Sequence, residues 1–316
     1  MSQLAAAPLI ARHAESTIWL ARYMERIENL ARLLDVTKTF AHDDSSWLSI
    51  LRINGDEAAF STQNVRAGHM AVARFYLLDS GNPTSVVAAI AQARENARTL
   101  RALISVEMWL HLNVFHAHIC ALTEADIAPE RLSLVCAMLK EGAQTHNGIT
   151  EGTFYRDQAW HFYMIGRHLE RADQTTRLLD TRFNELAPSA GSDEGDAGQW
   201  DALLRAVTGY HAYRRDHPHG YRPEEIVRFL LANTAFPRSV GLNLAQLEWH
   251  LTQLRVRHRL RGGAKALERV DHLCSLLTQQ SCADLLKQGL SPFLDWVQRE
   301  IAALHDDLVR AFCGAR

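Results

Sequence analysis

The stretch RYMERIENLARLLD (residues 22–35) occurs a second time as RHLERADQTTRLLD (residues 167–180). The two copies lie 145 residues apart and are identical at seven of fourteen positions, including a Glu-Arg pair and a closing Leu-Leu-Asp. A weaker third copy, KALERVDHLCSLL, spans residues 265–277. Because the first two copies match over about four helical turns, we interpret them as an internal repeat of one helix.

Helical geometry gathers the polar residues of each copy on one side. At about 100° per residue they fill an arc of roughly 120°, opposite the apolar residues. They are Arg22, Glu25, Arg26, Asn29 and Arg32 in the first copy, with Arg167, Glu170, Arg171 and Arg177 in register in the second. Such a stripe is a solvated helix face, a buried network that holds two helices in register, or a site for an anionic ligand.

The matching registers predict that the helices at about 9–40 and 152–184 pack against each other or against a shared third helix. We expect Glu25 and Glu170 to be partly buried and paired to Arg. Stripes packed on each other would favour a scaffold, and stripes lining an open cleft would favour ligand binding. In a ligand site, the arginines at 22, 26, 167 and 171 would hold the anion, and Glu25 or Glu170 would be the candidate general base.

A second dense stretch, SVVAAIAQARENARTLRALISVEMWLHLN (85–113), reads as one helix capped by Thr84 or Ser85. Its arginines stand at i, i+4 and i+7 and share a face, where they repel unless carboxylates or a ligand anion lie among them. The Glu residues of the repeated stripe are candidate partners. We therefore include this stretch in the candidate anion or partner site, with Arg94, Glu95, Asn96, Arg98, Arg101 and Glu107.

A third notable piece, FLLANTAFPRSV (229–240), suggests a helix opened by Pro237. This would place Arg238 and Ser239 in its first turn, where free backbone N–H groups and the helix dipole favour an anion.

Helical periodicity runs through most of the chain, and no segment alternates β-branched residues as a strand would. The pattern predicts an all-α multi-helix bundle that contains the repeated Glu-Arg helix. Residues 43–64 are turn-rich with a short helix at most, and residues 187–198 (APSAGSDEGDAG) read as a mobile loop within a single unit of residues 1–316. The other predicted helices cover about 66–79, 129–140, 199–215, 223–233, 237–256, 264–286 and 291–312.

Composition and missing motifs exclude several classes of protein. A net charge of −2 gives no basic field for nucleic acid or an anionic membrane, and no apolar run reaches the 18 residues of a membrane span. Five dispersed cysteines and the lack of a secretion signal indicate the cytoplasm. Walker, G-x-G-x-x-G, G-x-S-x-G, H-E-x-x-H and Glu-x-x-His motifs are absent, so we expect no metal or cofactor bound by this chain alone.

With these pieces in hand, the chain resembles the alpha-E superfamily, a bacterial family of all-helical domains with a characteristic Glu-Arg motif. The matching stretches begin at Trp19, Ala93, Gly166 and Phe229, follow the family's order and span nearly the whole chain. Leu110 is a departure, because the family often has Glu after Met-Trp.

The resemblance implies a partnership, since family members are typically found beside or fused to a circularly permuted ATP-grasp protein, often with a transglutaminase-like protein. ATP-grasp enzymes form amide bonds through acyl phosphates. We therefore expect an accessory or substrate-binding subunit of an ATP-grasp amide ligase in peptide or amide-metabolite synthesis or modification, with ATP and Mg on the partner. The alternatives are a purely structural helical scaffold or interaction protein, and an enzyme in its own right with a Glu/Arg site.

Overall fold

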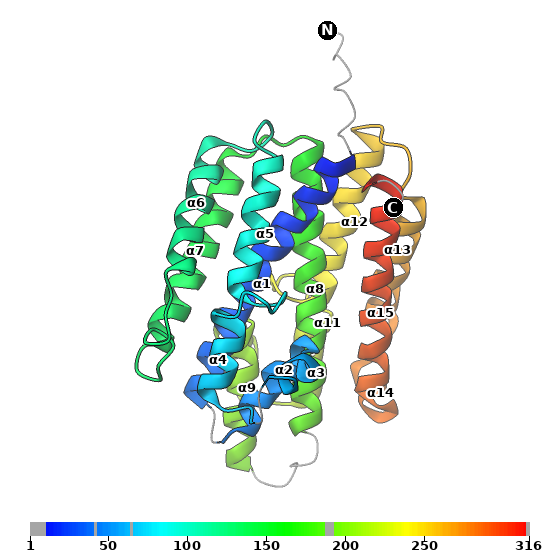
Figure 1. Ribbon diagram of the computed structural model, residues 1–316. Helices are drawn as coiled ribbons and strands as arrows, with labels where there is room; N and C mark the ends of the chain where they lie inside the picture. Colours follow the sequence, from blue (N-terminus) through cyan, green and yellow to red (C-terminus); the bar gives the residue numbers. More distant parts are fainter. Residues whose placement is uncertain (1–10, 41–42, 64–65, 187–192, 314–316) are drawn as a thin grey trace.

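Two long helices cross at the centre of the molecule and carry the two copies of the repeat (Figure 1). The computed structural model describes residues 11–40, 43–63, 66–186 and 193–313. Helices α1 (Ala11–Phe40) and α8 (Gln158–Leu186) both run from the upper to the lower end of Figure 1, so the repeats are parallel. Within the described ranges all regular secondary structure is helical, which confirms the predicted all-α bundle.

The other long helices flank this central pair on two sides. On one side are α5 (Val86–Thr99), α6 (Val106–Cys120) and α7 (Leu132–Thr153). On the other side are α12 (Val240–Val256), α13 (Ala264–Gln279) and α15 (Leu290–Leu308) (Figure 1). Helix α1 packs on α5 and α7, and α8 packs on α12 and α15, so the two repeats join the two sides.

Shorter helices complete the bundle. They are α2 (Ser45–Asn54), α3 (Glu57–Ser61), α4 (His69–Leu77), α9 (Asp193–Ala206), α10 (Tyr210–Asp216), α11 (Pro223–Leu231), α14 (Cys282–Gln288) and a terminal π-helical turn, η2 (Val309–Cys313). None of the helices in the described ranges is long and apolar enough to cross a membrane.

Helix α1 is enclosed on nearly all sides, and its polar face is buried as well as its apolar face. Ile18, Met24 and Ile27 have almost no exposed surface, and neither do Glu25 and Glu28. Because buried charges must be paired, the polar face of α1 has to find its partners within the protein.

The two central helices approach most closely at Gly166. A Cβ atom built on Gly166 would lie 2.3 Å from the carbonyl oxygen of Ile18 and 2.9 Å from its Cα. Only glycine fits this contact, because the clash would be with backbone that cannot move aside. The position that matches Gly166 in the first copy is Ala21, which is also small and buried.

Several predicted boundaries were wrong. The predicted helix over 85–113 is broken after Thr99, because the Ser105 hydroxyl accepts the Met108 N–H at 3.1 Å and begins a new helix, α6. The helix predicted at 129–140 extends well beyond residue 140, because α7 continues to Thr153 with buried residues spaced along one face.

In four further segments the observed helices also differ from the predicted ones. Residues 43–64 contain two helices, α2 and α3, where one at most was expected. The predicted helices at 199–215 and 264–286 are each divided in two, into α9 and α10 and into α13 and α14. Of the predicted mobile loop at 187–198, residues 193–198 belong to α9, and 187–192 lie outside the described residues.

A substitution at the helix crossing tests its tightness. We expect Gly166→Ala to lower the free energy of unfolding by about 1–3 kcal/mol, because the new methyl group meets the backbone of Ile18. Gly148→Ala is the matched control, since Gly148 lies inside α7 with nothing within 4 Å of a built Cβ. The control should raise stability by roughly 0.5–1 kcal/mol, as Ala favours a helix over Gly. Urea unfolding of both variants decides, and a neutral Gly166→Ala contradicts the tight crossing.

Candidate functional site

The Glu-Arg pairs of the two repeats bind each other reciprocally across the α1–α8 crossing. The Glu170 carboxylate on α8 accepts Arg22 Nε at 2.6 Å and Arg26 Nε at 2.5 Å, both from α1. The Glu25 carboxylate on α1 accepts Arg171 Nε at 2.9 Å and lies 3.3 Å from Arg167 Nε, both from α8.

The register of the repeat explains this reciprocity. Arg22 and Arg26 stand three residues before and one residue after Glu25 in the first copy, and Arg167 and Arg171 have the same places around Glu170. Each Glu is therefore bound by the two arginines that flank the Glu of the other copy. The predicted pairing of the two helices is confirmed, and the two glutamates are fully buried rather than partly buried, at 1% and 2% exposed.

A second acidic position in each repeat extends the network. Glu28 on α1 pairs with Arg32 one turn later, and the matching Asp173 on α8 pairs with Arg177 at 2.9 Å. Glu28 also lies 3.1 Å from Nη2 of Arg238. The sequence interpretation did not include Glu28, although the acidic residue in register at 173 was a signal for it.

Arg238 enters the network from a turn and not from the first turn of a helix, so its predicted place was wrong. Ser239 is the N-cap of α12, and its hydroxyl accepts the Leu242 N–H at 3.2 Å, which leaves Pro237 and Arg238 outside the helix. The Arg238 side chain is 7% exposed and also lies 3.7 Å from Glu25.

Side chains from three elements hold this turn in place. Thr175 Oγ1 on α8 donates to the Arg238 carbonyl at 2.8 Å, and Asn243 Nδ2 on α12 donates to the Pro237 carbonyl at 3.0 Å. Asn233 Oδ1 accepts two backbone N–H groups within the turn. The guanidinium of Arg238 is thereby directed at Glu25 and Glu28 of α1 by groups on α8 and α12.

Electrostatics keep both central carboxylates ionised. Burial by itself raises the pKa of Glu25, but the facing guanidiniums of Arg171, Arg238 and Arg167 together outweigh burial and lower it to about 2. Burial also raises the pKa of Glu170, but the positive charges of Arg22 and Arg26 outweigh burial, so that this pKa is lowered as well. A general base works best with a pKa near the operating pH, so this environment disfavours either Glu as a catalytic base.

An aromatic side chain covers the outer arginines of the first copy. The Arg22 guanidinium carbon lies 4.6 Å from the Trp19 ring centre, and that of Arg26 lies 5.4 Å from it. Such cation–π contacts replace water on the face of a guanidinium that is turned away from its carboxylate.

The second dense stretch does not join the network, so its predicted pairing with the repeated glutamates was wrong. Arg98 pairs with Glu95 on its own helix, and both side chains are exposed. Arg94 Nε donates to Asn113 Oδ1 at 2.8 Å, and the Arg101 guanidinium carbon lies 5.1 Å from the Trp109 ring centre. The predicted common face of three arginines is also wrong, because α5 ends at Thr99, before Arg101.

Other members of the stretch lie apart from this group. Asn96 lines a separate surface hollow beside His305, and Glu107 is exposed in the first turn of α6. In the third copy of the repeat, Glu268 is exposed, while Arg269 pairs with Asp307 at 2.9 Å. The third copy therefore pairs with α15 and takes no part in the α1–α8 crossing.

Within the part of the chain that the structure describes, no group of three or more His, Cys, Asp or Glu side chains is arranged to hold a metal ion. All five cysteines are free thiols.

Buried histidines lie beside the network and are kept neutral. His161 Nδ1 and His250 Nδ1 are 2.9 Å apart, and His168 Nδ1 is 2.9 Å from Oδ1 of Asn243, the residue that holds the Arg238 turn. Burial, followed by the neighbouring imidazoles of His168 and His161, lowers the pKa of His250 to about 2. Burial likewise lowers the pKa of His146 to about 3, and His146 is fully buried.

Two Arg→Lys variants compare the stability contribution of the buried network with that of an exposed ion pair. Arg171→Lys keeps the charge but loses the planar fork, so a buried carboxylate is left incompletely bonded. We expect a loss of about 1–3 kcal/mol in the free energy of unfolding. Arg98→Lys is the control, because its side chain is 68% exposed, and should change stability by less than about 0.5 kcal/mol. If both variants change the free energy of unfolding equally in chemical denaturation, the buried network stabilises the fold no more than an exposed ion pair does.

Stability should fall with acid in two stages. The folded-state pKa of a buried histidine lies below the ordinary 6.5, so the unfolded chain takes up protons first, and stability is lost as pH falls below 6.5. The Glu25 contribution is present above its ordinary pKa of 4.5 and is lost between there and about 2.

The variant His146→Leu isolates the first stage, because neither ring nitrogen of His146 has a hydrogen-bond partner to lose. We expect the slope of unfolding free energy between pH 6 and 4.5 to decrease by up to about 1.4 kcal/mol per pH unit, the value for one proton. An unchanged slope would mean that His146 titrates normally in the folded protein.

Comparisons with known proteins agree with this architecture. Residues 9–313 match the Alpha-E family, described as a predicted alpha-helical domain with a conserved ER motif. Uncharacterized proteins of Mycobacterium bovis and Mycobacterium tuberculosis are 28% identical over 262 residues, a region that covers 75% of this chain and 29% of each relative. The chain thus spans less than a third of the length of these curated relatives, and no solved structure matches it. Since the family match extends over almost the whole chain, the protein belongs to the Alpha-E family.

Proposed function

We propose that this chain is a rigid helical partner of an ATP-grasp amide ligase in the cytoplasm, acting in the synthesis or modification of peptides or similar amides. The observation that carries the proposal is the size of the relatives, in which the matched helical region is 29% of a longer polypeptide. In those relatives the helical region is covalently joined to further polypeptide, as expected for a partner that is sometimes fused to its enzyme. A transglutaminase-like protein is the proposed third component.

The lack of a nucleotide-binding motif decides how the work would be divided. The chain has no Walker or G-x-G-x-x-G loop to hold phosphates, so ATP and Mg would bind to the ligase, which would form the acyl phosphate. The helical chain would present a surface or a substrate to that enzyme.

The buried network supports a structural role for the Glu-Arg pairs within this partnership. Glu25 and Glu170 are each neutralised by arginines of the other repeat and are shielded from water. Removing one member would leave a buried charge unpaired, which is strongly destabilising, so the network fixes the register of the two repeats. This observation favours the scaffold alternative for the stripes themselves over a catalytic one.

The outer face of α6 is the surface that we propose for docking the ligase. Val106, Leu110 and Val114 repeat every four residues on this helix and are each more than half exposed. Trp109, with Arg94 and Arg101 close to its ring, lies beside them. Exposed apolar rows next to Trp and Arg are typical of protein interfaces, and α6 lies at one edge of the bundle (Figure 1).

Co-purification with the ATP-grasp protein of the same organism tests the proposal. We expect the two proteins to elute together and the mixture to form an amide with release of ADP, whereas neither does so alone. Val114→Glu should weaken the complex at least tenfold, because a charge enters an apolar interface. Val256→Glu is the matched control, since Val256 is an even more exposed valine on α12, away from α6.

The possible results separate the two parts of the proposal. If the two proteins neither co-elute nor form an amide together, the partnership is wrong. If they do, but Val114→Glu and Val256→Glu behave alike, the partnership stands and the docking face lies elsewhere.

A further inference from the structure

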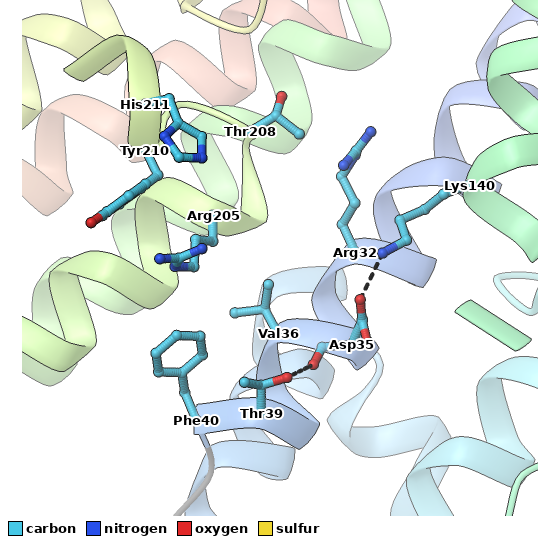
Figure 2. A pocket seen from close by; sticks show the side chains of 10 residues that line it. All are labelled: Arg32, Asp35, Val36, Thr39, Phe40, Lys140, Arg205, Thr208, Tyr210 and His211. Atoms are coloured by element: carbon cyan, nitrogen blue, oxygen red, sulfur yellow. Dashed lines mark hydrogen bonds and ion pairs between the residues drawn. The ribbon is translucent and has the colours of Figure 1, made fainter. Parts of the chain in front are cut away.

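A cavity of about 580 Å³ lies beyond the Glu-Arg network, where the end of α1 faces α7 and the junction of α9 and α10 (Figure 2). From the polar stripe of the first repeat, Arg32 lines this cavity, and the other lining residues were not among the candidates singled out from the sequence. The volume is within the range of small-molecule sites, roughly 300–1,000 Å³.

Most of the charge around the cavity is already balanced. Arg32 pairs with Glu28 inside the network, and Lys140 Nζ lies 2.6 Å from Asp35 Oδ2. Arg205 differs from both, because its nearest described carboxylate is Asp201, 3.9 Å from Nη2. Of these three cations, Arg205 is therefore the most weakly paired, through one long ion pair to a carboxylate on its own helix.

Aromatic rings hold the Arg205 side chain and form an apolar wall. Its guanidinium carbon lies 4.1 Å from the Tyr210 ring centre and 6.0 Å from that of Phe40. Figure 2 shows Arg205 between these two rings, with Val36 beside them. Stacking on rings leaves the N–H edge of a guanidinium free to donate two parallel hydrogen bonds, the geometry that a carboxylate accepts.

The backbone next to Arg205 is in an unfavourable conformation. Thr208 has φ of +59°, in the left-handed region, which is sterically poor for a β-branched residue. Such strain persists only when the surrounding structure imposes it, and it is enriched at ligand sites. Thr208 lies in the turn from α9 into α10, and just beyond this turn the Tyr210 ring packs on the Arg205 guanidinium (Figure 2).

We propose that this cavity binds a small monoanionic carboxylate with an apolar or aromatic body, of the size of an N-acyl amino acid. The carboxylate would pair with Arg205, and the body would pack on Phe40 and Tyr210. One weakly paired guanidinium suits a carboxylate better than a phosphate dianion. The site goes beyond the docking role proposed above, and its test needs no partner protein, so loss of the ligase partnership would leave it standing.

Calorimetric titration of the purified chain with N-acetyl-L-phenylalanine tests the site. We expect saturable binding of one molecule per chain, and binding of the neutral N-acetyl-L-phenylalaninamide at least tenfold weaker. Arg205→Gln should weaken binding of the acid about tenfold, as expected for the loss of one charge-assisted pair. Arg215→Gln is the matched control on α10, with a side chain that is 80% exposed, and should bind like the parent.

Several results would overturn the proposal. They are the absence of saturable binding of the acid, equal binding of acid and amide, equal binding by the parent and Arg205→Gln, and tighter competing binding of inorganic phosphate. If Arg205→Gln melts well below the parent, Arg205→Lys serves instead. It keeps the charge without the planar fork and should still weaken binding of the acid, and parent-like affinity in that variant would overturn the proposal.

Discussion

The reciprocal pairing of Glu25 and Glu170 with the arginines of the opposite repeat is the constraint on which the structure depends. Gly166 lets the backbones of α1 and α8 come close enough for each carboxylate to reach two guanidiniums. Neither helix could be buried with its own charges alone, because each Glu is neutralised by arginines of other elements, chiefly those across the crossing. The same contacts therefore bury the two helices and set their register. The flanking helices pack on the resulting pair.

The network also connects elements that are distant in the sequence. Arg238 brings the turn before α12 onto α1, and Asn243 connects the same turn to the neutral His168 on α8. Because these charged groups are paired within the protein, the Glu and Arg residues that define the repeat have a structural role. Binding is left to the outer face of α6 and to the cavity at Arg205.

The sequence could predict the α1–α8 pairing because the repeat itself encodes it: matching registers place Glu25 opposite the arginines around Glu170. It could not predict the part of Arg238, whose local pattern suggests only a helix start, and whose partner Glu28 lies 210 residues earlier. The site at Arg205 has no motif at all, since its residues come from three separate segments and meet only through packing. The break before α6 was missed because the cap at Ser105 lies within an apolar run that resembles one continuous helix.

A pair of double-mutant cycles tests the central claim most directly. One cycle combines Glu25→Gln with Arg171→Gln, and the other combines Glu170→Gln with Arg26→Gln, and each measures the free energy of unfolding. If reciprocal pairing holds the repeats in register, both cycles should give favourable coupling energies of about 1–3 kcal/mol, similar in the two halves. Coupling near zero in both cycles, with the single variants as stable as the parent, would contradict the account.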